Sequence, residues 1–145
     1  MKMILSILLL LSSFNATAGI VVIANTEGEQ FVGLSLDDIR RIFVAQQTTL
    51  DSGETITVVD LDEGTEGRNN FHSVVTGKSN SELQSDWAKQ IKAGRTLGRL
   101  FATDYEQVLK AVASDKTAIG YVSDEALDEN NLEQVQVINS LDKSQ

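Results

Sequence analysis

The hydrophobic positions along the chain form short unbroken runs that are typical of strands buried on both faces. Residues 19–24 (Gly-Ile-Val-Val-Ile-Ala) and 117–122 (Thr-Ala-Ile-Gly-Tyr-Val) show almost no polar alternation, and residues 55–61 (Thr-Ile-Thr-Val-Val-Asp-Leu) are rich in β-branched side chains. Runs of this length and composition predict strands in the interior of a sheet. A shorter run at residues 135–138 predicts a fourth strand.

Between these runs, apolar residues recur at helical spacing behind capping signals. Ser35 with Asp38, and Ser79 with Glu82, are pairs in which each residue can satisfy a free backbone N–H group at a helix start. Thr103 is expected to cap the last helix in the same way. The predicted apolar stripes are Leu36, Ile39, Ile42 and Phe43; Phe71 and Val75; Leu83, Trp87 and Ile91; and Tyr105, Val108, Leu109 and Val112.

These elements follow the order β-α-β-α-α-α-β-β, which predicts an α/β fold in which helices cover a small mixed or parallel sheet. The length of residues 19–145 suits a single domain, because domains cluster near about 100–150 residues. Gly120 lies inside a predicted strand and indicates either a close backbone approach or a bulge. The tail from Ser140 is expected to be frayed.

Residues 1–18 have the pattern of a secretory signal peptide. Lys2 precedes an apolar run at residues 4–11, and Ala16-Thr17-Ala18 forms an A-x-A cleavage site. Retention as an uncleaved anchor is the less favoured alternative, because the run is shorter than the ~20 apolar residues that span a bilayer. We expect cleavage after Ala18 and a soluble mature protein outside the cytoplasm, which in a Gram-negative cell is the periplasm.

Composition excludes several classes of function. The chain carries 12 Lys and Arg residues against 21 Asp and Glu, a formal net charge of −9, which argues against nucleic-acid binding and against an anionic membrane surface. It has no cysteine and one histidine, His72, so disulfides, thiolate metal sites and His-rich zinc sites are excluded. No Gly-x-Ser-x-Gly motif accompanies His72, and the acidic stretch from Asp60 fails the spacing of a calcium loop. We therefore expect His72 to be a packing or surface residue and the acidic stretch to be a solvated turn. We also expect that the protein is not an enzyme and has no cofactor.

The best candidate for a ligand site lies between the predicted strand at residues 55–61 and a short helix that is expected over residues 68–75. A glycine-containing loop before a helix brings free backbone N–H groups and the positive end of the helix dipole together, which suits an anion. We expect Gly64, Thr65, Gly67 and Arg68 to form this site. Thr65 would supply a hydroxyl and Arg68 a charged fork.

The alternative for this segment is an ordinary strand-to-helix loop. Its glycines would relieve backbone strain, and Arg68 would pair with a nearby carboxylate. Glu63 and Glu66 favour this alternative, because two carboxylates in the loop repel the anion that the loop would hold.

A series of segments recurs in the same order in one group of proteins: residues 34–43, Gly53, Ile56, residues 59–71, Gly77-Lys78, Trp87 and residues 118–122. The series resembles the phosphate-binding periplasmic proteins of ABC transporters, over roughly residues 20–122. The resemblance implies a single three-layer α/β lobe of periplasmic-binding-protein type, whereas larger members hold phosphate between two lobes. The family's Ser-Gly-Thr-Arg-type loop corresponds to Glu63-Gly64-Thr65 followed by Arg68, which implies ligand contacts from Gly64, Thr65 and Arg68.

Two functional hypotheses follow from the resemblance. In the first, the protein recognises phosphate or a similar oxyanion non-covalently, as substrate-binding proteins do in ABC transport. In the second, the lobe has lost its ligand and serves as an adaptor for a protein partner in the cell envelope. The second is favoured by Glu63, Glu66 and the lack of a hydroxyl-rich loop after Ala24. A hydrolase that uses His72 is the least favoured interpretation.

Overall fold

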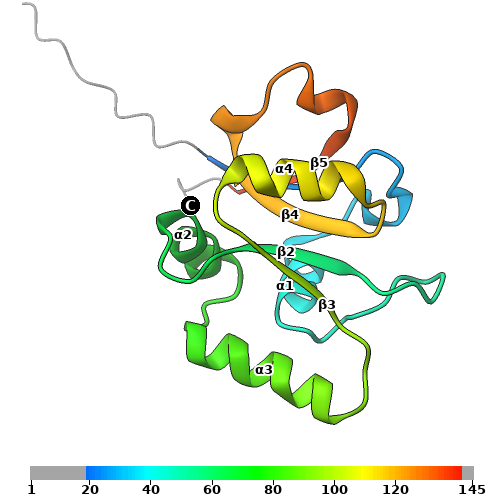
Figure 1. The fold of residues 1–145 in the computed structure, drawn as a ribbon, viewed down its shortest axis with the longest axis vertical. Coiled ribbons are helices and arrows are strands. Elements are labelled where there is room, and N and C mark those ends of the chain that lie inside the picture. The colour runs from blue at the N-terminus through cyan, green and yellow to red at the C-terminus, as the bar shows by residue number, and fades with distance from the viewer. Residues whose placement is uncertain (1–18, 142–145) are drawn as a thin grey trace, which may run out of the picture.

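The computed structural model describes residues 19–141, which form a five-stranded sheet with helices on both faces (Figure 1). The strand order is β3-β2-β4-β1-β5. Strand β2 is parallel to β3 and β4, whereas β1 is antiparallel to β4 and β5. The strands are β1 (Ile20–Asn25), β2 (Thr57–Leu61), β3 (Gly98–Ala102), β4 (Ala118–Ser123) and β5 (Val135–Leu141).

Within residues 19–141, four α-helices complete three layers around this mixed sheet. They are α1 (Leu36–Phe43), α2 (Glu66–Val75), α3 (Asn80–Lys92) and α4 (Tyr105–Ser114); short 3-10 turns are η1 (Glu29–Phe31), η2 (Asp124–Ala126) and η3 (Asn131–Glu133). Helix α4 covers one face, and α1 and α2 cover the other (Figure 1). The α/β fold predicted from the sequence is confirmed, including the layered lobe of periplasmic-binding-protein type.

The predicted capping boxes determine where two helices begin. Ser35 caps α1 by accepting from the N–H of Asp38, whose carboxylate accepts from the N–H of Ser35, and Ser79 with Glu82 does the same for α3. The prediction for α4 was wrong by one residue, because the cap is Asp104 rather than Thr103. An Asp side chain is the stronger cap of the two, since its charge also suits the helix dipole.

Strand β3 was not predicted from the sequence. Its residues are Gly-Arg-Leu-Phe-Ala, with only Ala102 buried, so neither an apolar run nor a two-residue alternation marks it. Strand β5 also continues past the predicted end at residue 138, and Leu141 is buried, so the expected fraying does not begin at Ser140. Residues 142–145 and the predicted signal peptide at 1–18 lie outside the described residues.

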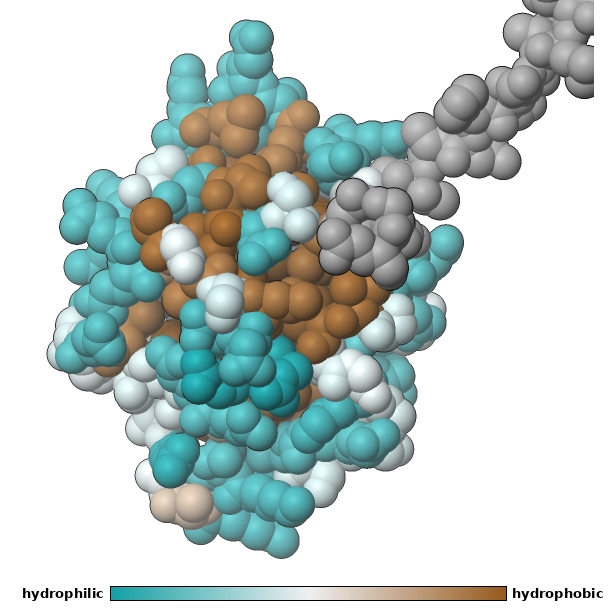
Figure 2. Space-filling model, turned by 180° about the vertical axis from the view of Figure 1, so that it is seen from behind, coloured by the Kyte–Doolittle hydropathy of each residue, from teal (hydrophilic) through white to brown (hydrophobic). Residues whose placement is uncertain are grey.

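Two members of the predicted apolar stripes face solvent. Leu36 is the first residue of α1 and is 41% exposed, and Ile91 lies in the last turn of α3 and is 64% exposed. Seen from behind, the molecule shows a broad area of apolar residues above a more polar lower part (Figure 2). Within residues 19–141, no helix combines the length and apolar character needed to cross a membrane.

Gly120 lets α4 approach the sheet closely. A Cβ atom added there would lie 2.9 Å from Cγ1 of Val108 and 3.3 Å from Cγ2 of Val112, both on α4. The pairing of β4 with β1 continues through Gly120 without a register shift, so the close approach, and not a bulge, explains this glycine. On the same face, the Asn25 side chain donates to the carbonyls of Val112 and Ala113, both at 2.9 Å.

Candidate functional site

The predicted site lies where β2 ends and α2 begins. Thr65 is the N-cap of α2, so the helix starts at Glu66, two residues before the predicted start. The Thr65 hydroxyl donates to the carbonyl of Asp62 at 2.8 Å and accepts from the N–H of Arg68 at 3.3 Å. Its only proton is therefore already used within the loop, and donation to a ligand would break the bond to Asp62.

The two glycines of the site have different roles. Gly64 has a φ of +89°, in the left-handed region that favours glycine, and it turns the chain into the helix. Gly67 lies in the first turn of α2, where an added Cβ would lie 2.4 Å from the Tyr105 hydroxyl and 2.7 Å from Cδ1 of Leu61. Gly67 is thus packed against its neighbours, and Tyr105 of α4 lies beside the helix start. Burial, and then the charge of Glu66, raise the pKa of Tyr105.

Arg68 points into the protein and not toward the helix start. Its side chain is only 2% exposed. The guanidinium donates through Nη1 to the carbonyl of Leu61 at 3.0 Å and through Nε to Oδ1 of Asn80 at 2.9 Å. Nη1 also lies 3.1 Å from Oδ2 of Asp60. This differs from the hypothesis that Arg68 is a charged fork for an anion at the helix start, and it agrees with the alternative in which Arg68 pairs with a carboxylate.

Asp60 is the centre of this buried polar cluster. Its carboxylate is also bonded to His72 Nε2 at 2.8 Å, and it accepts from the Tyr121 hydroxyl. Burial alone would raise the pKa of Asp60, but the hydrogen bond and charge of His72, the Tyr121 hydroxyl and the Arg68 charge outweigh it and lower that pKa. Conversely, burial and the Asp60 charge raise the pKa of Tyr121. The solvated turn expected from the sequence therefore does not include Asp60, which is a buried residue of β2.

The other members of the cluster are packed beside Asp60 in the interior. His72 is packed on α2, as one of the sequence interpretations held, with Nδ1 3.0 Å from the Thr76 hydroxyl and Nε2 on Asp60. The Phe71 ring stacks on Tyr121 with centroids 3.8 Å apart and an interplanar angle of 2°. Within residues 19–141, the histidine and acidic side chains form no group of three that could hold a metal ion.

At the start of α2, the groups that are available to a ligand are backbone N–H groups. Helix geometry leaves the N–H groups of Glu66 and Gly67 without intrahelical acceptors, and the positive end of the dipole adds to them. The structure therefore brings Gly64, Thr65 and Gly67 together at the loop, whereas the Arg68 guanidinium lies behind them. Such an arrangement can offer two hydrogen bonds to an oxyanion.

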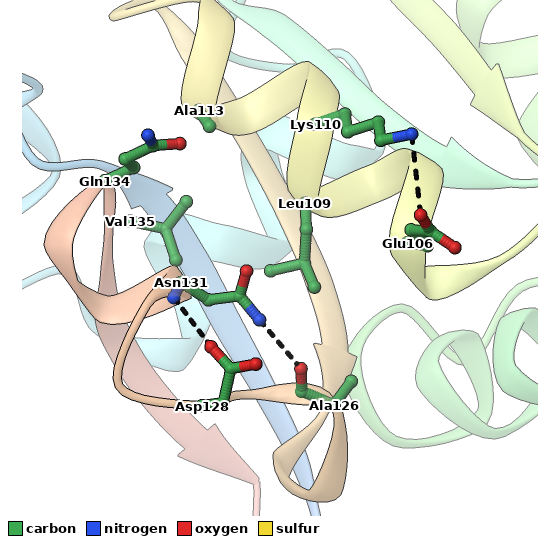
Figure 3. Close-up of a pocket in the computed structure, with 9 residues that line it drawn as sticks. All are labelled: Glu106, Leu109, Lys110, Ala113, Ala126, Asp128, Asn131, Gln134 and Val135. Atoms are coloured by element: carbon green, nitrogen blue, oxygen red, sulfur yellow. Dashed lines mark hydrogen bonds and ion pairs between the residues drawn. The ribbon is translucent and has the colours of Figure 1, made fainter.

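One cavity lies beside α2 and another beside α4, and neither is lined by residues 62–67. One, of about 530 Å³, lies between the end of α2 and the start of α3 and is lined by Arg68, Asn69, His72, Ser73, Gly77, Lys78, Ser79 and Asn80. The other, of about 390 Å³, lies between α4 and residues 126–135 (Figure 3). Several of its polar side chains bond within the protein (Figure 3). The Asp128 carboxylate accepts from the Asn131 N–H, the Asn131 side chain donates to the Ala126 carbonyl, and Lys110 pairs with Glu106.

The sequence contained one signal of the buried cluster. Asp60 interrupts a strand that is otherwise covered on both faces, so its charge needs a partner. Arg68 and His72 stand four residues apart on the following helix, on one face of it, where both can reach the strand. Tyr121 could not be assigned in this way, because the pairing of β4 beside β2 is a long-range feature.

Several solved structures have a similar fold. A candidate phosphate ABC transporter substrate-binding protein from Clostridium perfringens, with bound phosphate, has a TM-score of 0.62 and 22% identity over 84% of this chain and 44% of that chain. An ABC-type phosphate transport receptor from Vibrio cholerae gives 0.62 and 17% over 84% and 46%. PstS from Borrelia burgdorferi gives 0.65 and 11% over 84% and 47%. This chain has the fold of part of a phosphate ABC transporter substrate-binding protein.

The chain spans less than half the length of these structural neighbours. No family model matches the sequence, and no curated protein is similar to it. The fold resemblance predicted from the sequence is confirmed, and at these identities it concerns the fold alone.

Proposed function

We propose that this protein is an exported solute-binding-type protein that recognises phosphate or a similar oxyanion weakly at the start of α2. The observation that carries the proposal is the capped helix start, with free N–H groups at Glu66 and Gly67 behind the turn at Gly64. The fold supports it, because two of the three neighbours compared above are named for phosphate transport.

In this proposal the free N–H groups of Glu66 and Gly67 contact the anion beside the turn formed by Gly64 and Thr65, and Arg68 acts behind the loop. Its bonds to the Leu61 carbonyl and to Asn80 tie the end of β2 and the starts of α2 and α3 together. Because Asp60 lies 3.1 Å from the guanidinium, much of the positive charge of Arg68 is neutralised before it reaches the helix start. Arg68 is thus a positioning residue for the loop.

The expected affinity is low. Micromolar binding requires about −8 kcal/mol. A helix dipole contributes about 0.5–2 kcal/mol, and each hydrogen bond to a charged group about 1.5–3 kcal/mol. Two such bonds and the dipole must offset an association cost of about 4 kcal/mol or more. The site on this lobe alone is therefore expected to bind phosphate with a dissociation constant in the millimolar range or weaker.

Amide NMR during a titration with inorganic phosphate tests the proposal. The N–H signals of Gly64, Thr65, Glu66 and Gly67 should shift together and saturate at millimolar concentration, at constant ionic strength. Trp87 fluorescence is a poor reporter, because its indole is buried and bonded to the carbonyl of Phe43 at 3.1 Å.

Charge variants sharpen this experiment. Replacing Glu63 and Glu66 together by Gln removes two carboxylates from the loop, and phosphate affinity should rise by about threefold to tenfold. The matched control replaces Glu125 and Glu129 by Gln, which changes the net charge equally at two exposed positions of the segment after β4. Absence of saturable shifts in the loop up to tens of millimolar phosphate, in wild type and in both variants, would refute oxyanion binding.

Export is part of the proposal. The signal-peptide pattern at residues 1–18 supports cleavage after Ala18 and a periplasmic location. Expression of the full chain in a Gram-negative host, followed by osmotic-shock fractionation and N-terminal sequencing, should give a periplasmic protein that begins at Gly19. Recovery of the full-length chain in the membrane fraction would contradict cleavage and support the anchor alternative.

The adaptor hypothesis remains the second candidate. It is favoured by the burial of Arg68, because a guanidinium that is paired with Asp60 and bonded to the Leu61 carbonyl and Asn80 is less available to a ligand. If phosphate produces no loop shifts while a defined envelope protein binds the chain independently of phosphate, the adaptor hypothesis replaces the first.

A further inference from the structure

The sheet has two outer strands, and they are protected very differently. Strand β5 has a register shift where it pairs with β1, and it carries the polar residues Gln136, Asn139 and Ser140. Bulges and polar side chains are devices that keep an outer strand from pairing with another chain. Strand β3 pairs with β2 without a register shift, Arg99 is the only polar side chain among its five residues, and Leu100 and Phe101 are 50% and 52% exposed.

The backbone of β3 offers free hydrogen-bonding groups at two defined positions. The carbonyl of Ala102 accepts from the N–H of Asp62 at 2.9 Å, so the polar groups of Ala102 face β2. Backbone groups alternate sides along a strand, so those of Leu100 also face β2, and those of Arg99 and Phe101 face outward. Because β3 is the last strand of the sheet formed by residues 19–141, no strand of that part of the chain lies beside these outward N–H and C=O groups.

We infer that β3 pairs antiparallel with β3 of a second copy of this chain, about a two-fold axis at Leu100. This register places Arg99 opposite Phe101 of the other copy, and Phe101 opposite Arg99. Both positions carry the outward-facing backbone groups, so each pair exchanges two hydrogen bonds, and the Leu100 side chains meet at the intervening close pair. The register that the backbone requires is thus the register that a two-fold dimer produces.

The side chains suit this arrangement. Arg99 has its guanidinium carbon 4.7 Å from the Trp87 ring centroid and 4.6 Å from that of Phe101. Its Nε is buried and has no hydrogen-bond partner within residues 19–141. In the dimer each Arg99 lies beside a second Phe101 ring, and a cation over an aromatic face is attracted to it. The two exposed Leu100 side chains bury each other, while no two like charges stand directly opposite.

Net charge opposes the association at long range. With a net charge of −9 on each chain, two copies repel, and salt screens that repulsion. The dimer should therefore become stronger as sodium chloride is raised. An interface that depended on ion pairs between copies would become weaker under the same change.

Cross-linking at the two-fold axis tests the register directly. The chain contains no cysteine, so Leu100→Cys introduces a single thiol. Opposed residues of a close antiparallel pair have Cα atoms about 4.5 Å apart, within disulfide range. Leu132→Cys is the matched control, because Leu132 is 49% exposed and lies on η3, away from β3. Mild oxidation should convert Leu100→Cys to a covalent dimer and leave Leu132→Cys largely monomeric.

Sedimentation equilibrium of variants without cysteine completes the test. Wild type should show a concentration-dependent monomer–dimer equilibrium. Leu100→Lys should raise the dissociation constant at least about tenfold, because two ammonium groups then face each other. Leu132→Lys should not change it, and far-UV circular dichroism should show that both variants remain folded. Any of three results would overturn the inference: a monomeric wild type, a dimer that is insensitive to Leu100→Lys, or equal cross-linking of the two cysteine variants. A monomeric wild type is also the result expected if β3 pairs with another protein.

Discussion

Replacement of Arg68 by Met distinguishes a residue that holds the fold together from one that serves only a ligand. The guanidinium lies 3.1 Å from Oδ2 of Asp60 and donates to the Leu61 carbonyl and to Asn80. Its removal leaves a buried carboxylate without its cation, a change that costs about 3–5 kcal/mol. Asp60 keeps its bonds to His72 and Tyr121, so the cost should lie near the lower end of that range.

Two unpaired acceptors add to this cost. The Leu61 carbonyl and Oδ1 of Asn80 each lose a donor, worth about 1 kcal/mol where water cannot replace it. The Met side chain retains part of the buried apolar volume. We therefore expect Arg68→Met to lower the free energy of unfolding by about 3–5 kcal/mol, measured by urea denaturation at pH 7 with circular dichroism.

The matched control is Arg40→Met. Arg40 also pairs with an aspartate, Asp37, at 2.7 Å, but its side chain is 37% exposed. An exposed pair contributes about 0–1 kcal/mol, so this variant should unfold almost as wild type does. The double variant Asp60→Asn with Arg68→Met should be more stable than the sum of the single losses predicts, because no unpaired charge is left. If Arg68→Met costs no more than Arg40→Met, the assignment of Arg68 to a structural cluster is incorrect.

Three further predictions concern the same framework. In the folded state the pKa of Asp60 lies below its ordinary value of 3.8, so the ionised carboxylate stabilises the fold above pH 3.8, and this stabilisation is lost as the pH falls through the lowered pKa. Asp60→Asn should therefore reduce the difference between the unfolding free energies at pH 7 and pH 3. Gly120→Ala should cost about 1–3 kcal/mol in urea denaturation, since its Cβ would lie 2.9 Å from Val108, and Val108→Ala in the same chain should recover part of that loss. Ser79→Ala should cost about 0.5–2 kcal/mol and lower the Tm, because it removes the cap of α3, and an unchanged Tm would show that the capping box is not stabilising.

Features set by neighbouring residues in the chain could be predicted from the sequence. The starts of α1 and α3 follow from Ser35 and Ser79, because a capping hydroxyl acts on an N–H group three residues away. The fully buried strands β1 and β4 follow from unbroken apolar runs, since a strand covered on both faces leaves no place for polar alternation. These local signals were sufficient for the α/β fold.

What only the tertiary structure decided is the environment of each polar side chain at the candidate site. Strand β3 is recognisable by its pairing with β2, because its own residues are mostly exposed. Arg68 could have faced a ligand or the core, and both are compatible with a strand-to-helix loop. Tyr121, 61 residues further along the chain, donates to Asp60. On the buried side of α2, the same carboxylate pairs with the guanidinium of Arg68. The sequence determines which groups are present, whereas the low-dielectric interior determines which of them must pair with one another.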